Sequence, residues 1–177
     1  MTRIEHILME KTFEAVKAKG YDGYLFINLS PKVIISTEFI PHILNLTDRH
    51  QIDRSKIVFE ITERDTVRNL DLLVKFVHNL KAEGFKFAID DFGSGFSSFH
   101  YLKKFPIDFV KIEGDFIRSM ISEEKDAAFV KIVCILAKEL NIETIAECVE
   151  TSEVLAAIKG IDIDYAQGHF MGRPSPH

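Results

Sequence analysis

Short apolar runs alternate with amphipathic runs along the whole chain. The apolar runs are rich in Val, Ile and Phe and are too short for helices, so they predict buried strands. These strands are expected at residues 24–30, 56–62, 86–92, 109–113, 143–149 and, from a weaker pattern, 165–170. Between them, apolar residues recur at helical spacing, which predicts helices near 3–18, 38–50, 66–83, 126–140 and 151–159. The helix at 66–83 is the clearest, with Asp65 or Thr66 as its N-cap and Gly84 as its C-cap.

This β-α-β-α rhythm predicts an α/β fold with a parallel sheet and helices outside it. An open doubly wound sheet and a closed eight-stranded TIM-like barrel both have that rhythm. Most strands end in a polar, chemically useful side chain: Asn28, Glu60, Asp90, Asp91, Lys111, Glu147 and Gln167. The carboxyl ends of all strands meet at one mouth in a barrel, but only those near the switch point share a crevice in an open sheet. The pattern therefore favours the barrel.

The length does not suffice for a complete barrel. A (β/α)₈ barrel typically needs about 250 residues, whereas this chain has 177 and offers six strands. Because the chain opens on a helix, we expect a barrel that lacks about its first two strands, at the N-terminus.

Composition and charge limit the classes of partner. Hydrophobic residues make up 46% of the chain and charged residues 28%, which is typical of one soluble domain over residues 1–177. The net charge of −5 offers no basic surface for duplex DNA or RNA. No apolar run is long enough to cross a membrane, and there is no signal-peptide pattern. Cys134 and Cys148 show no metal-ligand spacing, so we expect both to be reduced in a cytoplasmic protein.

The strand ends supply the oxygen ligands of a metal site. Two adjacent aspartates repel each other and are costly in an apolar environment unless a cation compensates them. Oxygen donors suit Mg²⁺ or Mn²⁺, and the chain offers enough for one or two ions from Asn28, Glu60, Asp90, Asp91 and Glu147. Two ions would form the clamp used in phosphodiester hydrolysis, with Lys111 beside a catalytic water or the developing phosphate charge.

Each of these residues also has a plainer interpretation. The pair Asp90 and Asp91 alone is more typical of a turn and a helix cap, and Asn28 is typical of an Asx turn. Lys111 would then be a solvated charge at the rim, and Glu63 a solvent-facing acid in a loop. Glu60 is harder to dismiss, because it stands within an apolar strand, where a carboxylate normally has a partner. The chain has no Ser-His-Asp spacing, no P-loop and no dinucleotide-binding glycine fingerprint.

Five motifs occur in order: V-F-E-I-T-E (58–63), A-I-D-D-F-G-S-G-F-S-S (88–98), F-P-I-D-F-V-K-I-E (105–113), I-A-E-C-V-E-T (145–151) and A-Q-G-H-F-M-G-R-P (166–174). Together with N-L-S-P at 28–31, they resemble the EAL domains of bacterial cyclic-di-GMP signalling. The resemblance covers essentially the whole chain. It implies a modified (β/α)₈ barrel that hydrolyses cyclic di-GMP to linear pGpG with two Mg²⁺ or Mn²⁺ ions.

The resemblance also implies roles for individual residues. The metal ligands would be Asn28, Glu60, Asp90, Asp91 and Glu147. Lys111 would hold the region of the catalytic water, with Gln167 hydrogen-bonded near it. Glu63 would steady the loop that contains Phe92, Gly93, Ser94 and Gly95. In the family that loop couples the metal site to a dimer interface, so we expect a homodimer through residues 91–104.

The chain departs from the family pattern at four places. The Glu-Ala-Leu motif on the family's first strand is absent, so we expect little turnover by this chain alone. Cys148 replaces a glycine, Glu113 replaces an aspartate and His169 replaces an aromatic residue. A catalytically inactive cyclic-di-GMP receptor, or a scaffold for another protein, is therefore the alternative to the phosphodiesterase. In the parent protein we expect fusion to sensory or cyclase domains.

Overall fold

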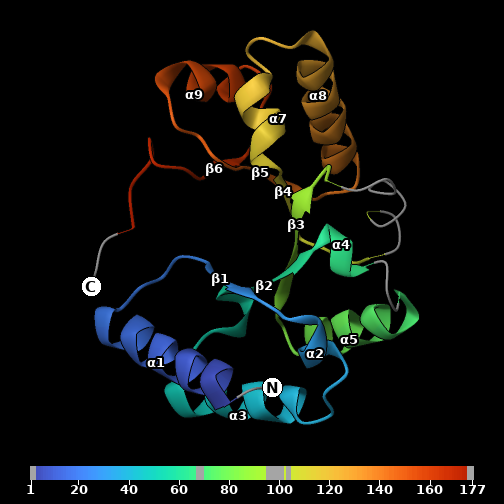
Figure 1. The fold of residues 1–177 in the computed structure, drawn as a ribbon. Helices are drawn as coiled ribbons and strands as arrows, with labels where there is room; N and C mark the ends of the chain where they lie inside the picture. Colours follow the sequence, from blue (N-terminus) through green and yellow to red (C-terminus); the bar gives the residue numbers. More distant parts are fainter. Residues whose placement is uncertain (1–2, 67–69, 95–101, 103–104, 175–177) are drawn as a thin grey trace. The chain divides into compact units, whose positions relative to one another are not determined.

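The computed structural model describes residues 3–66, 70–94, 102 and 105–174. Its strands are β1 (Leu25–Asn28), β2 (Ile57–Thr62), β3 (Lys86–Phe92), β4 (Phe109–Ile112), β5 (Glu143–Ala146) and β6 (Tyr165–Ala166). Its helices are α1 (Arg3–Lys19), α2 (Pro31–Ile34), α3 (Phe39–His50), α4 (Glu63–Thr66), α5 (Leu70–Ala82), α7 (Gly114–Ser119), α8 (Glu124–Glu139) and α9 (Ser152–Lys159), with a 3₁₀ turn, η1, at Arg54–Lys56. Described helices separate β1 from β2, β2 from β3, β4 from β5 and β5 from β6 (Figure 1).

The strands follow the order β1-β2-β3-β4-β5-β6. The pairs β1–β2, β3–β4, β4–β5 and β5–β6 are parallel. A doubly wound sheet reverses its strand order at a switch point, whereas consecutive order is the arrangement found in (β/α)₈ barrels. The order therefore favours the barrel type over the open sheet.

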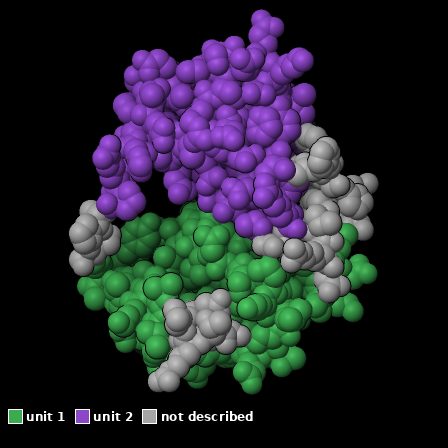
Figure 2. Space-filling view, viewed as in Figure 1, with its two compact units in different colours: residues 1–61, 65–87 green, residues 62–64, 88–177 purple. Residues whose placement is uncertain are grey.

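The chain is divided into two compact units, which Figure 2 colours green and purple. Unit 1 comprises Met1–Ile61 and Asp65–Phe87, and unit 2 comprises Thr62–Arg64 and Ala88–His177. Within unit 1, α1 packs on α3 and α2 packs on α5; within unit 2, α7 contacts α8 and α9, and α8 packs on β5. No helix in the described part of the chain is long and apolar enough to cross a bilayer.

An aromatic cluster forms the centre of unit 1. The Phe59 ring on β2 lies 5.8 Å from Phe39, 5.2 Å from Phe85 and 5.7 Å from Phe87, measured between ring centroids. All four rings are fully buried. Such aromatic pairs add more stability to a core than the burial of their surface alone would give. The core of unit 2 is built from strand residues such as Phe109 and Val110 and from the inner face of α8.

Several predicted boundaries were wrong. The predicted helix at 66–83 corresponds to α5 (Leu70–Ala82), and residues 67–69 lie outside the described residues. Asp65 and Thr66, predicted as N-cap candidates, lie instead within α4, which begins at Glu63 directly after β2. Gly84, with φ of +96°, follows α5 as predicted for a C-cap. The strand predicted at 143–149 ends at Ala146, because Cys148 has φ of +54° and cannot continue an extended strand. The short helix α7 was not predicted, since its six residues begin with a glycine.

Candidate active site

A β-bulge brings the two adjacent aspartates to one place. Ile89 pairs with Val110, but Phe92 pairs with Ile112, so β3 contains one residue more than β4 over this stretch. The backbone of Asp91 is left-handed, with φ of +52°. In a regular strand, the side chains of Asp90 and Asp91 would point to opposite faces. The bulge breaks that alternation, and carboxylate oxygens of Asp90, Asp91 and Glu147 lie within 4.8 Å of one another.

We call Asp90, Asp91 and Glu147 the carboxylate cluster. The left-handed conformation of a non-glycine residue costs about 1–2 kcal/mol, although aspartate tolerates it better than most residues. The surrounding structure maintains this conformation, since Phe92 is fully buried beyond it and the Ser94 amide donates to the Asp91 carbonyl oxygen at 3.2 Å.

A buried lysine lies beside the carboxylate cluster. Lys111 on β4 is 5% exposed, and its Nζ lies 2.9 Å from Oδ1 of Asp90 and 2.8 Å from Oε1 of Glu147. The interpretation of Lys111 as a solvated charge at the rim is therefore wrong. One ammonium group faces three carboxyl groups, so the cluster retains an excess of negative charge when all are ionised.

Burial raises the pKa of Glu147. The ammonium of Lys111 opposes that shift, and the charges of Asp90 and Asp91 add to it. Glu147 follows the end of β5, where its amide donates to the carbonyl oxygen of Ile112 at 3.4 Å. A carboxyl group whose charge is disfavoured in this way gains from any further cation nearby.

The carboxylate cluster fits a hard divalent cation. Its donors are all oxygens, which is the ligand type preferred by Mg²⁺ and Mn²⁺. Oδ1 of Asp90 is a buried oxygen that contacts Lys111 as an ion pair, without the alignment of a hydrogen bond. This oxygen can therefore also coordinate a metal cation.

Glu63 holds the loop that follows β3. It is 2% exposed, and its Oε2 accepts a hydrogen bond of 3.0 Å from the Gly93 amide, so its interpretation as a solvent-facing acid is wrong. Gly93 has φ of +114°, and a Cβ there would lie 2.7 Å from Cε2 of Phe116. Only glycine fits this turn. Ser94 is half-buried, whereas Gly95 and most of the expected dimer region lie outside the described residues.

Two further predicted ligands belong to unit 1. Asn28 ends β1 and is exposed, whereas Glu60 on β2 is 4% exposed. The two residues are register partners in the parallel β1–β2 pair, and the Leu29 amide donates to the Glu60 carbonyl oxygen at 2.9 Å. This register places the two residues opposite each other, at the end of β1 and two residues before the end of β2.

Gln167 lies next to the segment that contains Glu147. Its backbone amide donates to the Ala146 carbonyl oxygen at 2.8 Å, and its backbone carbonyl oxygen accepts from the Val149 amide at 3.0 Å. These bonds flank Glu147 on both sides. The side chain of Gln167 is exposed.

Glu113 is a residue of this region that was not among the predicted site residues. Burial raises its pKa, and the charges of Asp115, Asp91 and Glu63 add to that shift, while Arg64 opposes it. It follows the end of β4 directly, as the N-cap residue of α7, and the available signal was its place at a strand end two residues after Lys111.

Comparison with known proteins identifies the family of this chain. The family model described as "EAL domain" matches residues 1–174. The chain belongs to the EAL domain family. The EAL assignment and its α/β fold class are thereby confirmed.

Several relatives of this EAL chain are named for one activity. Cyclic di-GMP phosphodiesterase PdeB of Shewanella oneidensis is 37% identical over 155 residues, which cover 88% of this chain and 18% of that protein. Cyclic di-GMP phosphodiesterase PdeA of Borreliella burgdorferi is 39% identical over 150 residues, which cover 85% of this chain and 22% of that protein. The chain thus spans about a fifth of the length of the curated relatives it matches.

Solved EAL structures have the same fold. The PaMucR phosphodiesterase in complex with c-di-GMP superposes with a TM-score of 0.90 at 29% identity, over 98% of this chain and 72% of that one. The EAL domain of Mycobacterium smegmatis DcpA gives a TM-score of 0.87 at 28% identity, over 94% and 76% of the two chains. The chain therefore has the fold of the EAL-type barrel, of which it contains six parallel strands.

The structure also explains the glycine that the EAL resemblance implies at position 148. Cys148 has a left-handed backbone with φ of +54°, which favours glycine. Its side chain lies over Gly114, where a Cβ would come within 2.8 Å of the Cys148 Cβ. Cys148 and Gly114 therefore complement each other in size at the start of α7.

Proposed function

We propose that this chain forms the catalytic part of a metal-dependent phosphodiesterase that hydrolyses cyclic di-GMP to linear pGpG. The observation that carries the proposal is the convergence of Asp90, Asp91 and Glu147 beside the buried Lys111. The similarity to cyclic di-GMP phosphodiesterases supports the choice of substrate. The all-oxygen donor set supports Mg²⁺ or Mn²⁺ as the cation, with two ions in the complete site.

The carboxylate cluster would hold metal, and the family resemblance adds Asn28 and Glu60 as further ligands. When bound, the ions would neutralise the phosphodiester charge and supply an activated water nucleophile. Lys111 holds the carboxylates of Asp90 and Glu147 in place through its two ion pairs and contributes a positive charge toward the phosphate group in the transition state. Gln167 would add a hydrogen bond near the same region.

Glu63 acts in this proposal as a positioning residue. Its carboxylate accepts a hydrogen bond from the Gly93 amide. This hydrogen bond fixes the turn directly after Asp91 and Phe92. The left-handed conformation of Asp91 depends on that turn. We further propose that residues 91–104 form a homodimer interface through which dimerisation acts on the metal ligands.

The activity of the whole protein belongs to the same proposal. Because the chain spans about a fifth of its curated relatives, sensory or cyclase domains in the same polypeptide are expected. A cytoplasmic bacterial location fits a second messenger as substrate.

Cleavage of cyclic di-GMP tests the proposed function. The full-length protein is incubated with cyclic di-GMP and Mg²⁺, and pGpG is quantified by chromatography, with a chelator-treated sample for comparison. We expect metal-dependent pGpG formation that falls by at least about 100-fold in the Asp91→Asn variant. The matched control is Asp71→Asn, which changes an exposed aspartate on α5 and is expected to retain activity. Binding of cyclic di-GMP without cleavage would instead support the receptor alternative.

A further inference from the structure

We propose that Glu10, Glu14 and His50 form a second metal site, which takes a borderline divalent transition metal such as Zn²⁺ and links α1 to α3. We call these three residues the α1–α3 cluster. This site lies within unit 1, is made of other residues than the carboxylate cluster, and does not depend on the proposed phosphodiesterase activity.

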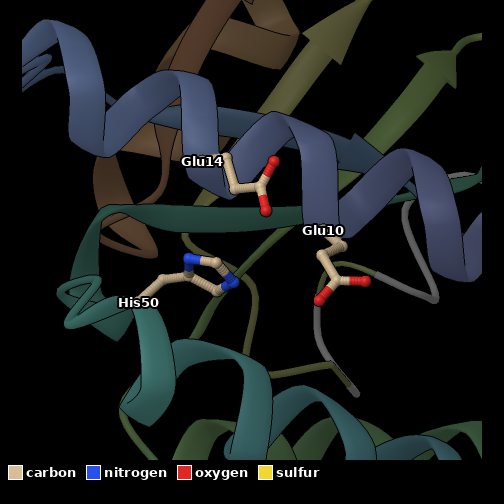
Figure 3. A group of neighbouring side chains, drawn as sticks. All are labelled: Glu10, Glu14 and His50. Carbon is tan, nitrogen blue, oxygen red and sulfur yellow. The ribbon is translucent and has the colours of Figure 1, made fainter.

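The two helices bring the three donors together. Glu10 and Glu14 are four residues apart on α1, so their side chains share one face of the helix. His50 is the last residue of α3, which packs on α1. One carboxylate oxygen of each glutamate and one ring nitrogen of His50 all lie within 4.8 Å of one another. Figure 3 shows the imidazole of His50 facing the carboxylates of Glu10 and Glu14 on the neighbouring helix.

The imidazole of His50 gives a second, independent observation that supports a ligand here. Nε2 of His50 is buried and has no hydrogen-bond partner among the described residues. A buried polar atom normally has a partner, because leaving it unpaired costs about 1–3 kcal/mol. A metal ion bound at this nitrogen would remove that cost.

Electrostatics around the α1–α3 cluster favour a cation. His50 lies in the last turn of α3, where the helix dipole presents its negative end. Arg49 also lies there, and its Nη1 is 3.0 Å from Oε1 of Glu10. This ion pair offsets one negative charge but also fixes the Glu10 carboxylate. Oε2 of Glu10 lies 3.7 Å from Nε2 of His6, which is ion-pair distance when that imidazole is protonated.

The donor set determines which metal fits. Imidazole nitrogen suits Zn²⁺ and neighbouring transition metals, whereas Mg²⁺ prefers oxygen donors alone. Ligands about 2.1 Å from a tetrahedral Zn²⁺ lie about 3.4 Å from one another. The donors of the α1–α3 cluster therefore need to approach by at most about 1.4 Å, a shift within the reach of small side-chain rotations. Three protein ligands would leave a fourth position for water.

Zinc binding tests this proposal directly. Untagged protein is titrated with ZnCl₂ by calorimetry in buffer with 5–10 mM Mg²⁺ (roughly the range that occupies oxygen-only sites), and the thermal midpoint is followed by circular dichroism. We expect one Zn²⁺ per chain with a Kd below about 10 μM and a rise in Tm of about 5 °C at 100-fold excess over Kd.

Three variants separate this site from other zinc binding. His50→Ala and Glu14→Gln are each expected to weaken Zn²⁺ binding by at least about 10-fold and, at the same Zn²⁺ concentration, to reduce the rise in Tm by about half or more. His78→Ala removes an exposed histidine on α5 and is expected to bind Zn²⁺ like the wild type. Because Glu14 is exposed, Glu14→Gln tests the site even if His50→Ala fails to fold. Failure of the wild type to bind Zn²⁺, or equal binding by the wild type and Glu14→Gln, would overturn the proposal.

Discussion

Replacement of Lys111 by methionine removes the positive charge beside the carboxylate cluster and keeps an unbranched side chain. In the wild type, the Lys111 ammonium contacts Asp90 at 2.9 Å and Glu147 at 2.8 Å. Lys111→Met leaves both carboxylates mostly buried, with side-chain exposures of 14% and 16%, and without their ion-pair partner. We therefore expect a large loss of stability.

The expected loss is about 3 kcal/mol at neutral pH. Removal of one partner from a buried ion pair typically costs about 3–5 kcal/mol, and the lower end applies here because both carboxylates retain some solvent contact. Burial already raises the pKa of Glu147, and loss of Lys111 raises it further. An acid whose pKa is higher in the folded protein gains stability as pH falls through that pKa. The loss should therefore shrink as pH falls from about 7.5 toward about 5.

Urea unfolding followed by circular dichroism measures this effect, since the chain has no tryptophan for fluorescence. The matched control is Lys131→Met, which changes an exposed lysine on α8 and should alter the free energy of unfolding by less than about 0.5 kcal/mol. Addition of Mg²⁺ should stabilise Lys111→Met more than the wild type, because the cation replaces the lost positive charge. A loss below about 1 kcal/mol at neutral pH, or one that does not shrink in mild acid, would refute the reasoning.

Three further predictions concern other positions of unit 2. Gly93→Ala should destabilise the protein by about 2–4 kcal/mol in urea unfolding, because the alanine Cβ would clash with Phe116 and the positive φ is unfavourable for alanine. A loss of stability under about 1 kcal/mol would contradict the steric argument for that turn. Cys148→Gly should change the free energy of unfolding by less than about 1 kcal/mol, since relief of the left-handed strain offsets the greater entropy of the unfolded chain. A larger loss of stability would show that the thiol contributes substantially to packing. Burial raises the pKa of Cys134 to about 11, so its thiol stays protonated at pH 7.5 and is a poor nucleophile. Alkylation followed by mass spectrometry should leave Cys134 unmodified in the folded protein, and rapid modification would contradict its burial.

The strands could be predicted from the sequence because buried parallel strands appear as continuous apolar runs. The predicted strand at 86–92 coincides with β3, and the one at 56–62 nearly coincides with β2. The carboxylate cluster was predicted from polar residues at strand ends, which parallel topology brings to one edge. Lys111, Asp90 and Glu147 do meet there.

The local geometry of the site could not be predicted from the residues alone. Alternation along a strand places Asp90 and Asp91 on opposite faces, and no glycine signals the left-handed backbone at Asp91 that brings them together. The α1–α3 cluster was missed as well. Glu10 and His50 are far apart in the sequence, and only the packing of α1 on α3 brings them together.

Binding of Mn²⁺ tests the central claim, that the carboxylate cluster is a cation site. Free Mn²⁺ is measured by electron paramagnetic resonance during titration of the wild type, Asp91→Asn and the control Asp71→Asn. We expect the wild type and Asp71→Asn to bind Mn²⁺ alike, competitively with Mg²⁺, and Asp91→Asn to bind at least about 10-fold more weakly. Equal Mn²⁺ affinity and stoichiometry in the wild type and Asp91→Asn would contradict the claim.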